Sequence, residues 1–207
     1  MKNIVLIGMM GCGKSTVGRL AAEKLGMAFV DTDERIEGDT GRAIPEIFAQ
    51  EGEAGFREHE LSVSRALARE QGLVIACGGG LPTRPDAIAS LKSSGAVFWI
   101  NRDPGVIYDT VSMAHRPLGQ GGKEDFLERF RQREPIYRRW ADYIIEAVRS
   151  RELRWFSFFL HCYENRLNGR VRRFLLREGL DRYDPERFLD YKMGCVLAML
   201  DCLRGYD

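Results

Sequence analysis

Residues 8–15 constrain this chain most strongly, because they read Gly-Met-Met-Gly-Cys-Gly-Lys-Ser and match the pattern G-x-x-x-x-G-K-[ST]. The apolar run 4–7 precedes them and an apolar-periodic stretch follows from Ser15, so the pattern predicts a strand, a tight loop and a helix. Gly8 and Gly13 permit backbone conformations that a side chain would block. Successive backbone N–H groups then converge on a phosphate at the positive end of the helix. A glycine-rich turn that happens to contain a lysine is the alternative.

The loop also predicts chemistry. Lys14 is expected to reach the β- and γ-phosphates of a nucleotide, and the Ser15 hydroxyl is expected to ligate Mg²⁺. Cys12 lies inside the loop at a helix N-terminus, a position at which cysteines are often reactive. We favour a small tolerated residue at this position; oxidation-sensitive nucleotide binding is the sharper alternative.

Composition narrows the class of protein. The chain has 207 residues and a net charge of +1, which predicts one domain, or one domain plus an appendage, and no nucleic-acid partner. The five cysteines are irregularly spaced, which favours reduced thiols and a cytoplasmic location. No signal peptide is expected, and no stretch approaches the length of a membrane span. The three histidines have no ligand spacing and receive no catalytic role.

Strand and helix patterns alternate along the chain. Buried strands are predicted at the apolar runs 4–7, 27–30, 73–76, 97–100 and 143–145. Helical patterns are predicted at 55–71, 84–92 and 123–140, and at a stripe formed by Val17, Leu20, Ala21 and Leu25. This alternation predicts an α/β fold with a parallel sheet covered on both faces, and ligands at the carboxyl ends of the strands.

The segments that follow the strands carry candidate site residues. Asp31 and Asp33 project from the same side if the backbone stays extended, so that one holds Mg²⁺ through water and the other faces a substrate hydroxyl. A turn or a helix cap is the alternative for these acids. Three consecutive glycines at 78–80 favour close approach of a ligand, with a plain tight turn as the alternative. Residues 113–122 have the composition of a flexible lid that carries Arg116.

Two arginines lie in helical patterns. Arg57 is near the start of one pattern, and Arg133 precedes Pro135, which interrupts another. Solvated surface arginines and a fork for a substrate carboxylate are both open interpretations.

The character of the chain changes near residue 150. Residues 151–178 form a helical pattern rich in aromatics and arginines, and a second helix is predicted after Asp184-Pro185, ending near Arg204. We therefore expect a domain at 1–148 and a C-terminal α-helical extension at 149–207. The extension is expected to dock on the core or to form a dimer contact, which makes the protein a monomer or a homodimer.

Taken together, six segments resemble the motifs of the shikimate kinase family, in order and at similar spacing. They are the phosphate loop 8–15, Asp31-Thr-Asp-Glu-Arg-Ile-Glu37, Phe56-Arg-Glu-His-Glu60, Gly78-Gly-Gly80, Arg116-Pro-Leu118 and Arg133-Glu-Pro-Ile-Tyr137. The resemblance implies a three-layer α/β/α P-loop kinase fold like that of nucleoside monophosphate kinases. It includes a five-stranded parallel sheet, a mobile substrate-binding region and a lid.

The resemblance also implies roles for individual residues. Lys14 would hold the transferred phosphoryl group, Ser15 would ligate Mg²⁺ with Asp31 reached through water, and Asp33 would bind the substrate diol and act as candidate base. Arg116 would swing with the lid to the ATP phosphates. The substrate would be held by Arg57, Gly79 and Arg133, and ATP by Gly11, Cys12, Gly13, Lys14, Ser15, Thr16 and Arg116.

The implied function is ATP- and Mg²⁺-dependent phosphorylation of the 3-hydroxyl of shikimate in aromatic amino-acid biosynthesis. Two alternatives stand beside it: the same fold acting on another small hydroxy acid such as homoserine, and a nucleotide-binding regulatory module without activity. The chain departs from the family pattern at Asp109, where an arginine often packs on adenine, at Gly119 in the lid, and in the helices at 151–207.

Overall fold

The computed structural model describes residues 2–110 and 122–146. The predicted lid with Arg116 and the predicted extension at 149–207 lie outside the described residues, so both stay predictions. The strands are β1 (Asn3–Ile7), β2 (Ala28–Asp31), β3 (Leu73–Ala76), β4 (Gly95–Asn101) and β5 (Tyr143–Glu146). The helices are α1 (Lys14–Leu25), α2 (Thr32–Thr40), α3 (Ile44–Leu67), the 3₁₀ turn η1 (Leu81–Thr83), α4 (Pro85–Ser94), α5 (Pro104–Thr110) and α6 (Gly122–Trp140).

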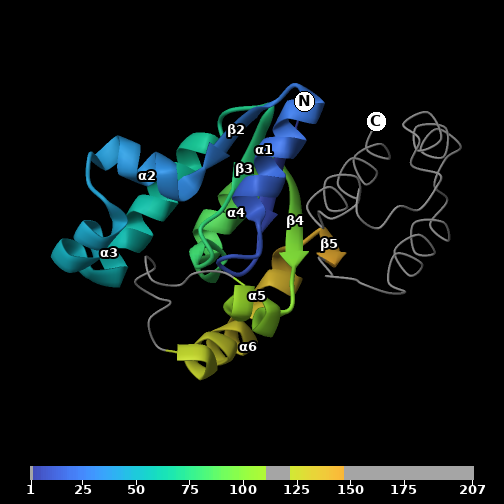
Figure 1. The fold of residues 1–207 in the computed structure, drawn as a ribbon. Coiled ribbons are helices and arrows are strands. Elements are labelled where there is room, and N and C mark those ends of the chain that lie inside the picture. Colours follow the sequence, from blue (N-terminus) through green and yellow to red (C-terminus); the bar gives the residue numbers. More distant parts are fainter. Residues whose placement is uncertain (1, 111–121, 147–207) are drawn as a thin grey trace, which may run out of the picture.

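The strands form one parallel sheet in the order β2-β3-β1-β4-β5, with β1 at its centre (Figure 1). This confirms the predicted five-stranded parallel sheet, and each apolar run identified in the sequence lies on a strand. Because helices connect parallel strands, the carboxyl ends of all five meet at one edge. The phosphate loop, the start of α2 and the glycine turn 78–80 follow β1, β2 and β3 at that edge.

Alternate residues of β1 enter two separate hydrophobic layers. Ile4 and Leu6 pack with α1, α5 and the first half of α6, whereas Val5 and Ile7 pack with α3, α4 and the second half of α6. All four side chains are at most 1% exposed. A strand that is buried on both faces reads as a continuous apolar run, which is why residues 4–7 were legible in the sequence.

Three helical features differ from the sequence predictions. Helix α2 begins at Thr32, directly after β2, so the backbone does not stay extended through Asp33 and the alternative, a helix cap, is confirmed for Asp31. The helix begins here for a local reason: the Asp31 side chain accepts a hydrogen bond from the Asp33 N–H at 3.0 Å and caps the helix. Helix α5 was not predicted, and Pro135 does not interrupt α6 but lies inside it, where it forfeits one backbone hydrogen bond.

Helix α3 is longer than predicted and bends at Gly52. It begins at Ile44 rather than near residue 55, and Gly52 has φ 69° and ψ −174°, outside the helical region. Glu46 closes the N-terminus by accepting the Ala43 N–H at 3.0 Å. The bend places Glu53 at the start of the second segment, which carries Arg57.

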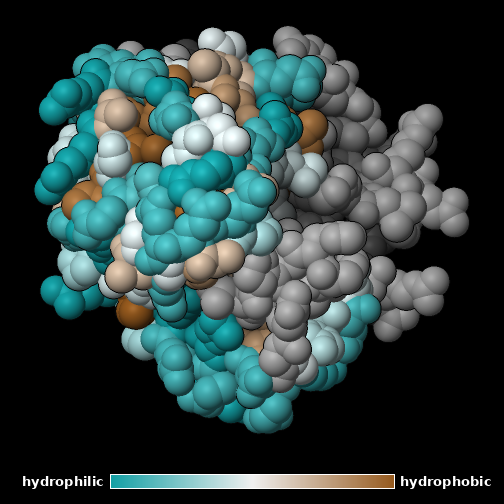
Figure 2. All heavy atoms as spheres, turned by 90° about the vertical axis from the view of Figure 1, so that its left-hand side faces the viewer, coloured by the Kyte–Doolittle hydropathy of each residue, from teal (hydrophilic) through white to brown (hydrophobic). Residues whose placement is uncertain are grey.

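The face formed by α2 and α3 is mostly hydrophilic (Figure 2). Ion pairs such as Arg35–Asp39 and Arg42–Glu51 cover it. Among the described residues Ile144 is the one large hydrophobic side chain that is exposed, at 40%. Within residues 2–110 and 122–146, no helix combines the length and the apolar character needed to cross a bilayer.

Candidate active site

The phosphate loop connects β1 to α1 as the sequence predicts. Gly8 and Gly13 have φ values of 142° and 106°, and a Cβ at Gly8 would lie 2.6 Å from the carbonyl oxygen of Ile100. Both conformations favour glycine, and the close approach of β4 excludes a side chain at Gly8. The Lys14 ammonium donates to the carbonyls of Gly8 at 2.9 Å and Met9 at 3.0 Å. It is therefore held inside the loop, at 8% residue exposure.

Ser15 and Asp31 meet where the predicted magnesium site lies. The Ser15 hydroxyl donates to Asp31 Oδ2 at 2.6 Å, while Oδ1 of the same carboxylate caps α2. Asp31 is thus both a helix cap and the acceptor of the Ser15 hydroxyl, and its role toward Mg²⁺ stays a prediction. A hydroxyl beside a carboxylate suits a hard cation such as Mg²⁺. In the described residues, no cluster of three or more His, Cys, Asp or Glu side chains forms a complete protein metal site.

Cys12 is fully buried within the loop. Its residue exposure is 0%, and its Sγ lies 3.8 Å from the Lys14 ammonium. A buried thiol is closed to dissolved oxidants, which supports a packing role over oxidation-sensitive binding. Of the other residues predicted to bind ATP, Gly11 and Gly13 are half-buried and Thr16 is exposed on the first turn of α1.

The three glycines at 78–80 leave space for neighbouring protein groups. A Cβ at Gly78 would lie 2.5 Å from Asp33 Oδ1, and one at Gly79 would lie 3.0 Å from the Met10 nitrogen. At Gly80, it would lie 2.4 Å from Arg57 Nη1. Each glycine therefore admits a different part of the site: the acid, the phosphate loop and the arginine. The close approach that we expected from a ligand is already made by the protein's own groups.

Asp33 lies in the first turn of α2, and its carboxylate lies against Gly78. The Gly78 N–H donates to the Thr32 hydroxyl at 2.8 Å, which joins the start of α2 to the glycine turn. Asp31 thus contacts the phosphate loop, whereas Asp33 lies against the glycine turn. The two acids have different neighbours because Asp31 caps helix α2 and Asp33 lies within its first turn.

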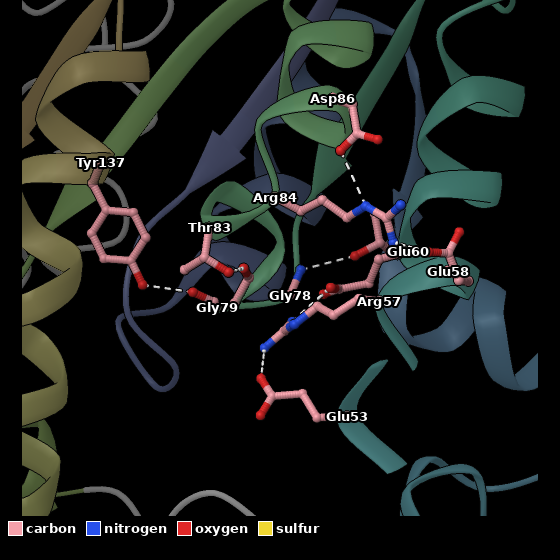
Figure 3. Close-up of polar contacts among 12 residues, drawn as sticks. Glu53, Arg57, Glu58, Glu60, Gly78, Gly79, Thr83, Arg84, Asp86 and Tyr137 are labelled. Carbon is pink, nitrogen blue, oxygen red and sulfur yellow. Dashed lines mark hydrogen bonds and ion pairs between the residues drawn. The ribbon is translucent and has the colours of Figure 1, made fainter. Parts of the chain in front are cut away.

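Arg57 is fixed by two glutamates that the sequence analysis did not identify (Figure 3). Nη1 contacts Glu60 and Nη2 contacts Glu53, each at 2.6 Å. The Arg57 side chain is 13% exposed and that of Glu60 is 1% exposed, whereas Glu53 is 58% exposed. The signal was present, because residues three and four apart on a helix are neighbours. It was not distinctive, since charged residues are frequent along 51–60.

Burial and pairing shift the pKa values of this pair. Burial raises the pKa of the Glu60 carboxyl, against the pull of Arg57 and Arg133. For Arg57, burial alone would lower the pKa, but attraction to Glu60 and the bonds to both glutamates raise it above its ordinary value. The guanidinium therefore stays charged, with its orientation set from within the protein.

Arg133 enters the same region from α6. It is 7% exposed, and its Nη1 is buried without a hydrogen-bond partner in the described part of the chain. One turn later the Tyr137 hydroxyl donates to the Gly79 carbonyl at 2.6 Å (Figure 3). A buried guanidinium nitrogen with hydrogen-bonding capacity left over fits an anionic ligand better than a solvated surface arginine.

Arg102 is a basic residue that the sequence analysis missed. It follows β4 directly, is 8% exposed, and its Nη1 donates to the Gly11 carbonyl at 3.3 Å. A cation that directly follows strand β4, beside the phosphate loop, is the signal that could have identified Arg102.

Asp109, where the family pattern often has an arginine, lies on α5 and pairs with Lys123 at 2.8 Å.

Comparison with known proteins agrees with this geometry. The family model described as "SKI: Shikimate kinase" matches residues 10–164. The chain is 43% identical over 151 residues to the shikimate kinase of Nitrosomonas europaea, covering 72% of each chain. It is 44% identical over 142 residues to that of Symbiobacterium thermophilum, covering 65% of this chain and 80% of the relative.

A solved structure extends the likeness to three dimensions. The shikimate kinase of Acinetobacter baumannii in complex with shikimate superposes with a TM-score of 0.70 at 36% identity, covering 81% of this chain and 96% of that one. The kinase fold, the phosphate loop and the sequence relatives agree. This chain belongs to the shikimate kinase family.

Proposed function

We propose that this protein transfers the γ-phosphoryl group of ATP to the 3-hydroxyl of shikimate, a step in aromatic amino-acid biosynthesis. One observation carries the proposal: the buried Nη1 of Arg133 has no partner among the described residues and lies near the Glu60 carboxyl that orients Arg57. Arg57 and Asp33 both approach the glycine turn that touches the phosphate loop. Two cations and an acid next to a phosphate site suit a small acceptor with a carboxylate and a hydroxyl.

The arginines would bind the acceptor through its carboxylate. The Arg57 guanidinium is already oriented, so little side-chain entropy is lost when an anion binds. Arg133 offers the buried Nη1, and Gly79 offers backbone at the edge of the phosphate loop. This would place the acceptor hydroxyl near Asp33, which faces the same turn.

Asp33 would accept the hydroxyl proton while Lys14 stabilises charge on the transferred group. The contacts of Lys14 to two loop carbonyls would be replaced by phosphate oxygens as the nucleotide binds. Mg²⁺ would be held by the Ser15 hydroxyl, with Asp31 reached through water, and when bound it supplies charge neutralisation at the phosphates. Arg116 would contribute from the lid. We also propose a cytoplasmic location, with a monomer or a homodimer as the functional state.

A substrate panel tests the proposal. Shikimate, homoserine and other small hydroxy acids are each assayed with the full chain by coupled ADP release, with ATP and Mg²⁺, and with Mg²⁺ removed by chelation. We expect turnover with shikimate that chelation abolishes and added Mg²⁺ restores. Preference for homoserine would assign another acceptor to the fold. Measurable ATP binding without turnover on any acceptor would indicate a regulatory module.

A further inference from the structure

We propose that Tyr137 is a positioning residue whose buried hydroxyl fixes the Gly79 peptide, so that Gly79 and Arg133 meet the acceptor at a set distance from the phosphate loop. The inference rests on the proposed function, because it concerns how the acceptor is held. Its basis is the contact between α6 and the glycine turn, because the motif 133–137 by itself assigns no role to Tyr137.

The hydroxyl of Tyr137 has a fixed position. It donates to the Gly79 carbonyl at 2.6 Å and lies 3.9 Å from the Met9 sulfur. The residue is 0% exposed, and its ring centroid lies 6.0 Å from that of Trp99 on strand β4. Burial raises the pKa of Tyr137, so the hydroxyl keeps its proton and remains a donor.

Gly79 is held from two sides as a result. A Cβ at Gly79 would lie 3.0 Å from the Met10 nitrogen, so the phosphate loop packs directly against this residue. The Tyr137 hydroxyl contacts both Gly79 and the neighbouring loop residue Met9. The peptide that would face the acceptor is therefore set relative to the groups that would face ATP.

The same helix carries Arg133, one turn before Tyr137. The hydroxyl thus joins the element that supplies an arginine to the turn that supplies Gly79. Without it, the Gly79 carbonyl loses its donor and the turn loses its bond to α6 (Figure 3). An acceptor that must contact both elements would then bind more weakly, while the loop around Lys14 keeps its own hydrogen bonds.

Tyr137→Phe isolates the hydroxyl, because the ring that packs on Trp99 is kept. From the worth of one buried hydrogen bond, we expect the shikimate KM to rise about tenfold, with kcat within about threefold and ATP KM within about twofold of wild type. Calorimetric titration of the full chain with shikimate should show the same loss of affinity. Tyr143→Phe is the matched control, since it removes a hydroxyl from a ring that stacks on Phe98 in the sheet.

The two KM values and kcat together decide the outcome. An unchanged shikimate KM, or a fall in kcat with both KM values unchanged, would overturn the proposal, because a merely structural hydroxyl lowers only the active fraction. If Tyr137→Phe melts within the temperature range of the assay, the measurement is repeated in a background that carries Gly38→Ala. This substitution is expected to stabilise helix α2, because alanine favours a helix and a Cβ at Gly38 meets nothing within 4 Å. Wild-type protein without shikimate turnover would instead refute the proposed function, which separates the two failures.

Discussion

Gly80→Ala would displace Arg57 without touching the phosphate loop. The new Cβ would lie 2.4 Å from Nη1 and 2.5 Å from Nη2 of Arg57. An ordinary contact requires the guanidinium to move away by about 1 Å. Because Nη1 contacts Glu60 at 2.6 Å, that movement stretches the bond beyond hydrogen-bonding range.

The expected change in shikimate KM follows from the hydrogen bond that the displaced Arg57 would no longer give to the shikimate carboxylate. A hydrogen bond to a charged group contributes about 1.5–3 kcal/mol. At about 1.4 kcal/mol for each factor of ten, the shikimate KM should rise roughly ten- to a hundredfold. The ATP KM should stay near wild type, because Lys14 and its loop carbonyls are not displaced. The melting temperature should also fall, because the buried Glu60 carboxylate loses its bond to Arg57.

The assay is coupled ADP release, with each substrate varied at saturation of the other, alongside thermal melting. Gly38→Ala is the control, because a Cβ there meets nothing within 4 Å and alanine favours the helix. A folded Gly80→Ala protein with wild-type shikimate KM would refute the assignment of Arg57 to the acceptor. Equal increases in both KM values would place the effect at the nucleotide instead.

Three further substitutions test other parts of the site. Asp33→Asn should reduce kcat at least a hundredfold while ATP affinity by calorimetry survives, because the amide cannot accept a proton; near-normal turnover would remove Asp33 from the mechanism. Arg133→Ala should raise the shikimate KM at least tenfold more than the ATP KM, and comparable increases would contradict its acceptor role. Glu60→Gln should remove a loss of stability that wild type shows as pH rises above 4.5, since the raised Glu60 pKa favours the protonated carboxyl in the folded state. Urea unfolding between pH 4 and pH 8 checks this, and parallel pH profiles for both proteins would contradict it.

The elements that the sequence predicted well are those with a strong local cause. The five apolar runs are strands because a central parallel sheet buries both faces of each strand. The phosphate loop is legible because Gly8 and Gly13 are required by backbone conformation over a short segment. Helix α2 was not predicted, although Asp31 is a good N-cap. The same acid also suits a metal site, and the sequence pattern does not distinguish a helix cap from a metal ligand.

The site was only partly predictable for a related reason. The sequence placed Asp33 and Gly79 after strands and both arginines in helices. It did not decide whether the arginines lie on the surface or in the site. Their burial depends on contacts between segments far apart in the chain. Tyr137 reaches Gly79 across 58 residues, and no local pattern records that contact. Glu60 contacts Arg57 from three residues away on the same helix, but nothing in the sequence distinguishes this pair from the other charged residues nearby.

The sequence by itself determined the nucleotide loop, the order of strands and helices along the chain, and the family resemblance, because each depends on residues close together. Only the tertiary structure decided how the acceptor half is built. Asp33 and Arg57 approach Gly78 and Gly80 so closely that a Cβ would collide with them, and a Cβ at Gly79 would make a tight contact with Met10. Such packing is a property of several chain segments brought together, so it becomes visible only when the sheet has aligned their ends.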